Sequence, residues 1–80
     1  MQQEIYLIIS NYAYRNTKIQ GAFTKETVSD HYSIMDACKP ESWLREKVGP
    51  YNIKYYSIDD DGNKNFQEQL YIQKQLVVGS

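Results

Sequence analysis

The fold class follows from one stretch of the sequence, residues 51–72, which reads YNIKYYSIDDDGNKNFQEQLYI. Apolar and polar side chains alternate on both sides of Asp61-Gly62, which is typical of strands that bury one face. Asp-Gly is a favoured two-residue hairpin turn, because both positions tolerate positive φ. The stretch therefore predicts an antiparallel β-hairpin that closes at Asp61-Gly62.

Closing the hairpin at this turn sets the register expected for its two strands. Asp60 then faces Asn63, and counting back gives the pairs Ser57–Phe66, Tyr55–Glu68, Ile53–Leu70 and Tyr51–Ile72. The apolar residues of both strands then share one face, which favours this register. The other face is expected to be wet, and it carries Asn52, Lys54, Tyr56, Gln67, Gln69 and Tyr71. The second strand is expected to continue through Leu76 to Val78.

The N-terminal segment predicts a second pair of strands. Residues 4–11 have apolar side chains on both faces, which is typical of a strand in the interior of a sheet. Arg15-Asn16-Thr17 is polar and predicts a turn. Residues 18–23 form the expected return strand, in which Gly21 marks a bulge or a place where a helix comes close.

The middle of the chain has helical spacing. Thr24 is the expected N-cap, and an apolar stripe follows at steps of three and four: Val28, His31/Tyr32, Met35 and Cys38. Pro40 then opens an expected second, shorter helix that ends at Gly49-Pro50. The prediction is an α+β domain: a small antiparallel sheet of about four strands, with one main helix and a short second helix on one face.

Length and composition indicate one small domain, residues 1–80, whose last residues are an expected disordered tail. Only eighteen residues are Leu, Ile, Val or Phe, and eight tyrosines and one tryptophan supply the remaining large apolar surface. The longest apolar run has five residues, no positive charge precedes it, and Cys38 has no second cysteine to pair with. We therefore expect a cytoplasmic protein with no membrane partner.

No set of residues predicts catalysis or a bound cofactor. His31 and Cys38 are seven residues apart on the expected helix, about 10 Å, whereas a nucleophile and its base must lie within about 3 Å. The four glycines are scattered, so no phosphate-binding loop is expected. We expect a non-enzymatic protein without cofactors.

The hairpin turn has one feature of a calcium-binding loop. With Gly62 at loop position 6, the ligand positions 1, 3, 5 and 12 of an EF-hand loop fall on Ser57, Asp59, Asp61 and Glu68. Ser57 removes one anionic ligand, and the flanking segments are expected strands instead of helices. The sequence favours a solvated acidic turn without a metal, and a calcium-responsive module with Asp59, Asp61 and Glu68 as ligands is an alternative.

Tyrosines gather at both expected hairpins. The predicted partner-binding residues are Tyr12, Tyr14 and Arg15 near the first turn and Lys54, Tyr56 and Tyr71 on the second hairpin. Tyr and Arg are enriched where proteins bind proteins, although tyrosines can equally wrap a small core with their hydroxyls in water. Single-stranded nucleic acid, stacking on the same aromatic side chains, is an alternative partner. A net charge of −1 and few nearby cations count against it.

The layout resembles that of short phage and mobile-element accessory proteins. The likeness consists of the opening strand Ile5-Tyr6-Leu7-Ile8-Ile9, the strand-to-helix junction of residues 21–26 (GAFTKE) and a late tyrosine-rich strand. It implies a single-domain protein that binds a larger host protein, such as an inhibitor of a bacterial defence system with an anti-CRISPR-like role. The apolar end Leu76-Val77-Val78 also predicts self-association into a homodimer through the last strand.

Overall fold

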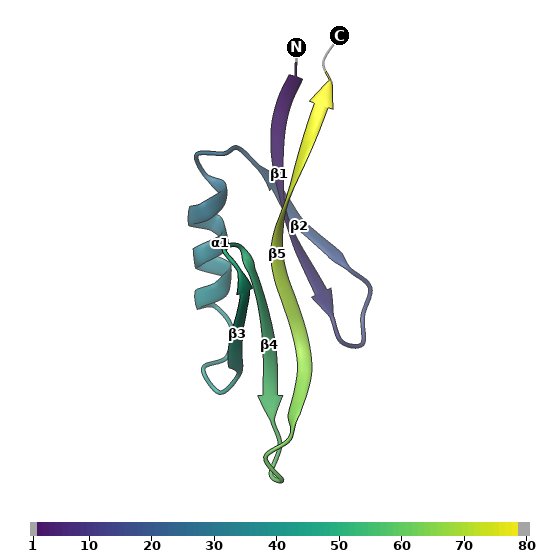
Figure 1. Ribbon diagram of the computed structural model, residues 1–80, viewed down its shortest axis with the longest axis vertical. Coiled ribbons are helices and arrows are strands. Elements are labelled where there is room, and N and C mark those ends of the chain that lie inside the picture. The colour runs from purple at the N-terminus through teal and green to yellow at the C-terminus, as the bar shows by residue number, and fades with distance from the viewer. Residues whose placement is uncertain (1, 79–80) are drawn as a thin grey trace.

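The computed structural model describes residues 2–78 as one antiparallel sheet with a helix on one face (Figure 1). The elements are β1 (Gln2–Tyr12), β2 (Lys18–Phe23), α1 (Val28–Ala37), β3 (Leu44–Gly49), β4 (Asn52–Ile58) and β5 (Lys64–Val78). The strand order is β2-β1-β5-β4-β3, so β1 is interior, as its sequence predicted. An α+β fold is roughly fitting, but the sheet has five strands where about four were expected. The expected disordered tail lies outside the described residues.

The fifth strand replaces the expected second helix, and that part of the prediction was wrong. Pro40 begins only a single turn, in which the Trp43 N–H donates to the Pro40 carbonyl at 3.1 Å. The chain then extends as β3 and pairs with β4 at the edge of the sheet. Arg45 and Lys47 face one side of β3 and Glu46 faces the other. Charged side chains on both faces suit an exposed edge strand.

The helix starts later than expected and buries a narrower stripe. The Thr24 carbonyl accepts the N–H groups of Thr27 and Val28, so a turn precedes the helix and its N-cap is Thr27. Val28 and Tyr32 are the buried helical residues. Cys38, expected to be buried, is exposed at the C-cap.

The central register of the β4–β5 hairpin is confirmed, whereas the register at its tip was wrong. Ile53 pairs with Leu70 and Tyr55 with Glu68, as expected. The loop is longer than two residues, because Ile58 faces Lys64, and the register then shifts by one position between Tyr55 and Tyr56. Gln67 is the extra residue of this bulge. The bulge places Phe66 opposite Tyr56 and on the face opposite to the one expected.

β2 does contain a bulge, but its extra residue is Gln20, next to the Gly21 expected there, because Ile8 pairs with Gly21 and Ile9 with Ile19. Gly21 also lies under the ring of Phe23: a Cβ at residue 21 would be 2.8 Å from its Cζ. The same ring stacks on His31 at a centroid distance of 4.4 Å. The missing side chain of Gly21 therefore lets Phe23 connect β2 to the helix.

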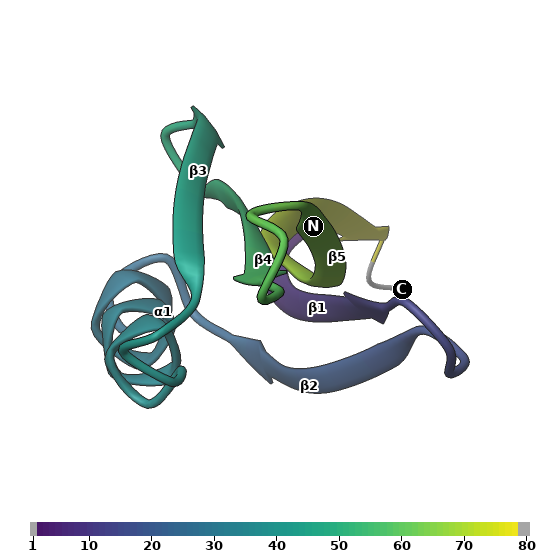
Figure 2. The same ribbon diagram turned by 90° about the horizontal axis from the view of Figure 1, so that it is seen from below.

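The core lies between α1 and the middle of the sheet. Its buried residues are Ile8, Val28, Tyr32, Ile53, Tyr55 and Leu70. The Tyr32 hydroxyl donates to the Leu70 carbonyl at 2.7 Å, which satisfies a polar group inside this apolar cluster. Seen along its length, the sheet curves, with α1 between the edge strands β2 and β3 (Figure 2).

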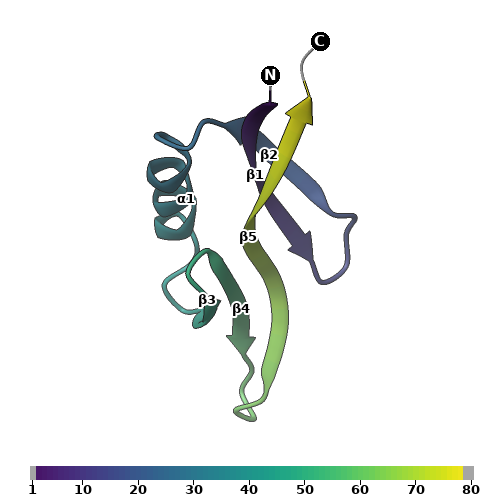
Figure 3. The same ribbon diagram turned by 45° about the horizontal axis from the view of Figure 1, so that its top comes forward.

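The molecule is elongated, with principal extents of 56 × 23 × 18 Å. Its radius of gyration is 14.6 Å, whereas a compact chain of this length would have about 12 Å. The β4–β5 hairpin projects at one end and a two-stranded ribbon of β1 and β5 at the other (Figure 3). Within residues 2–78, no helix combines the length and apolar character needed to span a bilayer.

Candidate binding surface

The six predicted binding residues fall into two groups on different parts of the molecule. Lys54, Tyr56 and Tyr71 lie on the face of the sheet that is turned away from α1, which we term the outer face. Their strand neighbours Tyr55 and Leu70 point into the core on the other face. Tyr12, Tyr14 and Arg15 lie where β1 ends and the chain turns toward β2. Tyr12 pairs with Glu68 and therefore faces the helix side.

The middle of the outer face is aromatic and aliphatic. Ile9 is flanked by Tyr71 on β5 and Ile19 on β2, and only 5% of its surface is exposed although no described helix covers this face. Residues directly opposite on neighbouring strands pack side by side, so Tyr71 borders an apolar centre. Beside it, the Gln69 amide donates to Asn52 Oδ1 at 2.7 Å, which orients both amides.

The second aromatic cluster of the outer face lies toward the hairpin tip. The Tyr56 ring meets Phe66 edge to face at a centroid distance of 5.9 Å. Lys64 Nζ lies 4.7 Å from the Tyr56 centroid and 3.5 Å from Glu46 Oε2. The ring of Tyr56 is thus held in place by its neighbours. Phe66 is not among the six predicted binding residues, because the bulge at Gln67 moves its side chain to the outer face.

Tyr12, Tyr14 and Arg15 border a different feature, a groove of about 410 Å³ on the helix side of the sheet. Ala13, Trp43, Gln67 and Glu68 complete its lining. Tyr12 is held by Gln20, whose amide donates to the phenol oxygen at 3.1 Å, whereas Tyr14 is 92% exposed. This group cannot meet the same flat partner surface as the outer face.

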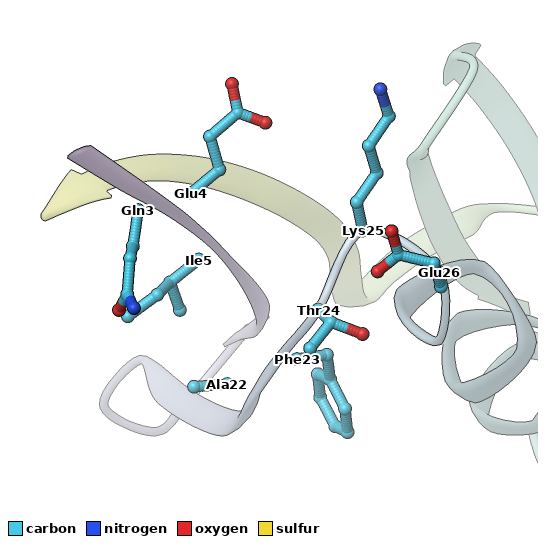
Figure 4. A pocket seen from close by; sticks show the side chains of 8 residues that line it. All are labelled: Gln3, Glu4, Ile5, Ala22, Phe23, Thr24, Lys25 and Glu26. Carbon is cyan, nitrogen blue, oxygen red and sulfur yellow. The ribbon is translucent and has the colours of Figure 1, made fainter. Parts of the chain in front are cut away.

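A larger hollow, about 590 Å³, lies where β2 parts from β1 (Figure 4). Pairing of the two strands stops at Tyr6 and Phe23, and the chain then leaves for the helix through Thr24. Gln3 and Ile5 of β1 lie across the opening from Ala22 of β2. The charged side chains at its rim, Glu4, Lys25 and Glu26, include both signs, so the hollow favours no particular ion.

The carboxylates proposed as calcium ligands are not brought together. Asp59 Oδ1 accepts the backbone N–H groups of Asp61 and Asn63 at 3.0 and 2.8 Å, so it closes the hairpin loop. These hydrogen bonds, first the one from Asn63, lower the pKa of Asp59. Glu68 lies further along β5, buried, with both oxygens accepting from Lys39 Nζ at 2.9 and 2.7 Å. Among residues 2–78, no three His, Cys, Asp or Glu side chains are grouped to hold a metal ion.

A charged cluster joins α1 to the strands β3 and β4. Arg45 donates two hydrogen bonds to the Asp36 carboxylate, at 2.8 and 2.6 Å, and the Tyr55 hydroxyl donates a third at 2.6 Å. Burial alone would raise the pKa of Asp36, but these hydrogen bonds outweigh it and the pKa is lowered. Burial, followed by the bond to Asp36, raises the pKa of Tyr55. The cluster therefore holds an ionised carboxylate against a neutral phenol.

This cluster predicts an acid-dependent loss of stability. Because the pKa of Asp36 is lower in the folded chain, its contribution is complete above the ordinary value of 3.8 and disappears as pH falls through the lowered value. We expect Asp36→Asn to lower the free energy of unfolding by about 1 kcal/mol at neutral pH, and the difference from wild type to shrink in acid. Urea unfolding of both proteins over a pH series measures this. Asp60→Asn, in the exposed loop, is the control, and a difference that stays constant down to the acid limit would contradict the prediction.

Comparison with known proteins does not supply a function: no family model, curated protein or solved structure matches this chain.

Proposed function

We propose that this chain is a non-enzymatic protein-binding module that attaches to a larger protein through its outer face. The observation that carries the proposal is the arrangement of Tyr56, Phe66 and Tyr71, three half-buried aromatic side chains on the sheet face that α1 leaves open. Large aromatic side chains that are already ordered lose little conformational freedom on binding. Such side chains carry much of the binding energy at protein interfaces.

The rest of the outer face supports a partner surface of low charge. Its polar side chains are mostly amides, and Gln69 and Asn52 already bond to each other. Of its two described lysines, Lys54 and Lys64, the latter is paired with Glu46. A protein surface with an apolar centre and a hydrogen-bonding rim fits this composition. The resemblance to phage accessory proteins makes a bacterial host protein, including a defence protein, the first class of partner to test.

The aromatic side chains would also suit single-stranded nucleic acid, which is the second candidate partner. Affinity for a phosphate backbone comes largely from cations. Two lysines on the outer face and a net charge of −1 supply little of it. The charge distribution therefore favours a protein partner.

The proposal is tested with variants of the outer face and a matched control. Wild-type protein captures its partner from bacterial lysate, and the affinity of the purified partner is then measured by calorimetry. We expect Tyr56→Ala and Tyr71→Ala each to weaken binding at least tenfold, because loss of an interface aromatic side chain commonly costs about 2 kcal/mol. Tyr14→Ala, which removes an exposed tyrosine that borders the helix-side groove instead of the outer face, should change the affinity less than twofold.

Three results would contradict this function. One is loss of binding in Tyr14→Ala with full affinity in Tyr56→Ala. Another is failure of the wild type to retain any protein in stoichiometric amount. The third is tight binding of a poly-dT oligonucleotide that falls steeply with added salt, which would establish the nucleic-acid alternative. Urea unfolding of each variant separates a lost contact from a lost fold.

A further inference from the structure

The last third of β5 has a free edge. β4 pairs with β5 only as far as Tyr71, and the last described backbone hydrogen bond on that side runs from the Ile72 N–H to the Tyr51 carbonyl at 3.0 Å. From Gln73 to Val78, β5 pairs with β1 alone. The two strands form the ribbon that projects from the sheet in Figure 3.

The hydrogen bond of Ile72 shows which backbone groups this edge offers. Successive residues of a strand direct their N–H and C=O groups to opposite sides. The backbone N–H of Ile72 points toward β4. The backbone groups of Lys74, Leu76 and Val78 therefore point to the same side, where the described chain has no strand to pair with them. A row of free backbone groups at a sheet edge is a template for pairing with another strand.

The side chains of the ribbon are unusual for an edge exposed to water. Leu76 is 54% exposed and Val77 37% exposed. The only described ion pair there, Lys74 with Glu4 at 3.0 Å, is satisfied within the ribbon, so no net charge repels an approaching strand. A two-stranded ribbon buries little apolar surface by itself, and a third strand would cover more.

We propose that this edge binds a second copy of the chain, with the two β5 strands antiparallel about a two-fold axis at Leu76. Leu76 then faces Leu76 of the second copy, and Lys74 faces its Val78. In this register the backbone groups that point to the free edge, those of Lys74, Leu76 and Val78, all form hydrogen bonds with the second copy. An axis at Lys74 would oppose two lysines, and an axis at Gln75 would need the Ile72 N–H, which Tyr51 already accepts.

Pairing in this register continues the sheet into ten strands and keeps corresponding faces together. The outer faces of both copies then lie on the same side, uncovered by the contact. The dimer is thus independent of the proposed function, and either one could fail without the other.

Sedimentation equilibrium over a concentration series tests the dimer. We expect the wild-type mass to rise from 9.4 kDa toward twice that value. Leu76→Lys should raise the dissociation constant of the dimer at least tenfold, because two lysines would then be directly opposed. Within its own sheet residue 76 pairs with Glu4, so this lysine meets a carboxylate and the monomer remains folded. Val48→Lys, at an exposed position on the opposite edge strand β3, should leave the dimer unchanged.

Amide hydrogen exchange of the wild type gives a second readout that needs no variant. The Leu76 N–H should exchange more slowly as protein concentration rises, whereas the Gln75 N–H, which points toward β1, should not depend on concentration. A wild type that remains monomeric up to about 1 mM overturns the proposal. So does dimerisation that Leu76→Lys leaves intact or that Val48→Lys abolishes.

Discussion

Replacing Lys39 by methionine is expected to lower the free energy of unfolding by about 3–5 kcal/mol, the largest effect we foresee for a charged residue. Glu68 is the reason. Its side chain is 4% exposed, and both carboxylate oxygens accept hydrogen bonds from Lys39 Nζ. Methionine keeps most of the apolar stem but removes the charge, which leaves a buried carboxylate without its partner.

A double-mutant cycle distinguishes this explanation from a simple loss of packing. Lys39→Met combined with Glu68→Met removes both charges, and we expect it to recover most of the lost stability, because two apolar side chains need no partner. Lys74→Met is the control: it breaks the exposed pair with Glu4 and should cost less than about 1 kcal/mol. Urea denaturation monitored by circular dichroism measures the four proteins of the cycle (wild type, Lys39→Met, Glu68→Met and the double variant) and the control. If Lys39→Met alone stays within about 1 kcal/mol of wild type, Glu68 does not depend on this lysine.

Leu70→Ala is expected to cost about 2–5 kcal/mol, a large share of the stability of a domain this small. Leu70 is fully buried on β5, opposite Ile53 and below α1. Removing its branched end leaves a cavity at the centre of the core. The Tyr32 hydroxyl bonds to the carbonyl of residue 70, so that hydrogen bond does not depend on the side chain being replaced.

Leu76→Ala is the matched control, because it is the same substitution on the same strand at a position that is 54% exposed. We expect a change within about 0.5 kcal/mol. Thermal unfolding at low protein concentration keeps any association through β5 from contributing to the comparison. Equal losses for the two variants would show that the core is not centred where the structure places it.

The candidate surface could be predicted in part from the sequence. Lys54 and Tyr56 are two residues apart on one strand, so they share a face whatever the register. Tyr71 joins them because the apolar pattern aligns Ile53 with Leu70. Phe66 could not be placed in this way. One extra residue at Gln67 reverses every side chain beyond it, and the polar sequence around the turn contains no apolar pattern that would report the shift.

The expected helix at residues 40–48 failed for a related reason. Trp43, Leu44 and Val48 have a spacing that a short helix or an edge strand can use equally well. The choice depends on a long-range partner: β4 was available for pairing, and Arg45 of β3 reaches Asp36 on α1. In a segment this short, pairing with the sheet outweighs the weak intrinsic helix preference.

By itself, the sequence determined that residues 51–72 form a hairpin, that residues 5–9 belong to an interior strand and that an amphipathic helix follows the first two strands. These features depend on the alternation of neighbouring side chains, which is local. Only the tertiary structure decided that Glu68 meets Lys39 across 29 residues, that Tyr12 and Tyr56 face opposite sides and that the end of β5 is unpaired. Each of these depends on which strands become neighbours, and burial of the whole apolar set selects that arrangement.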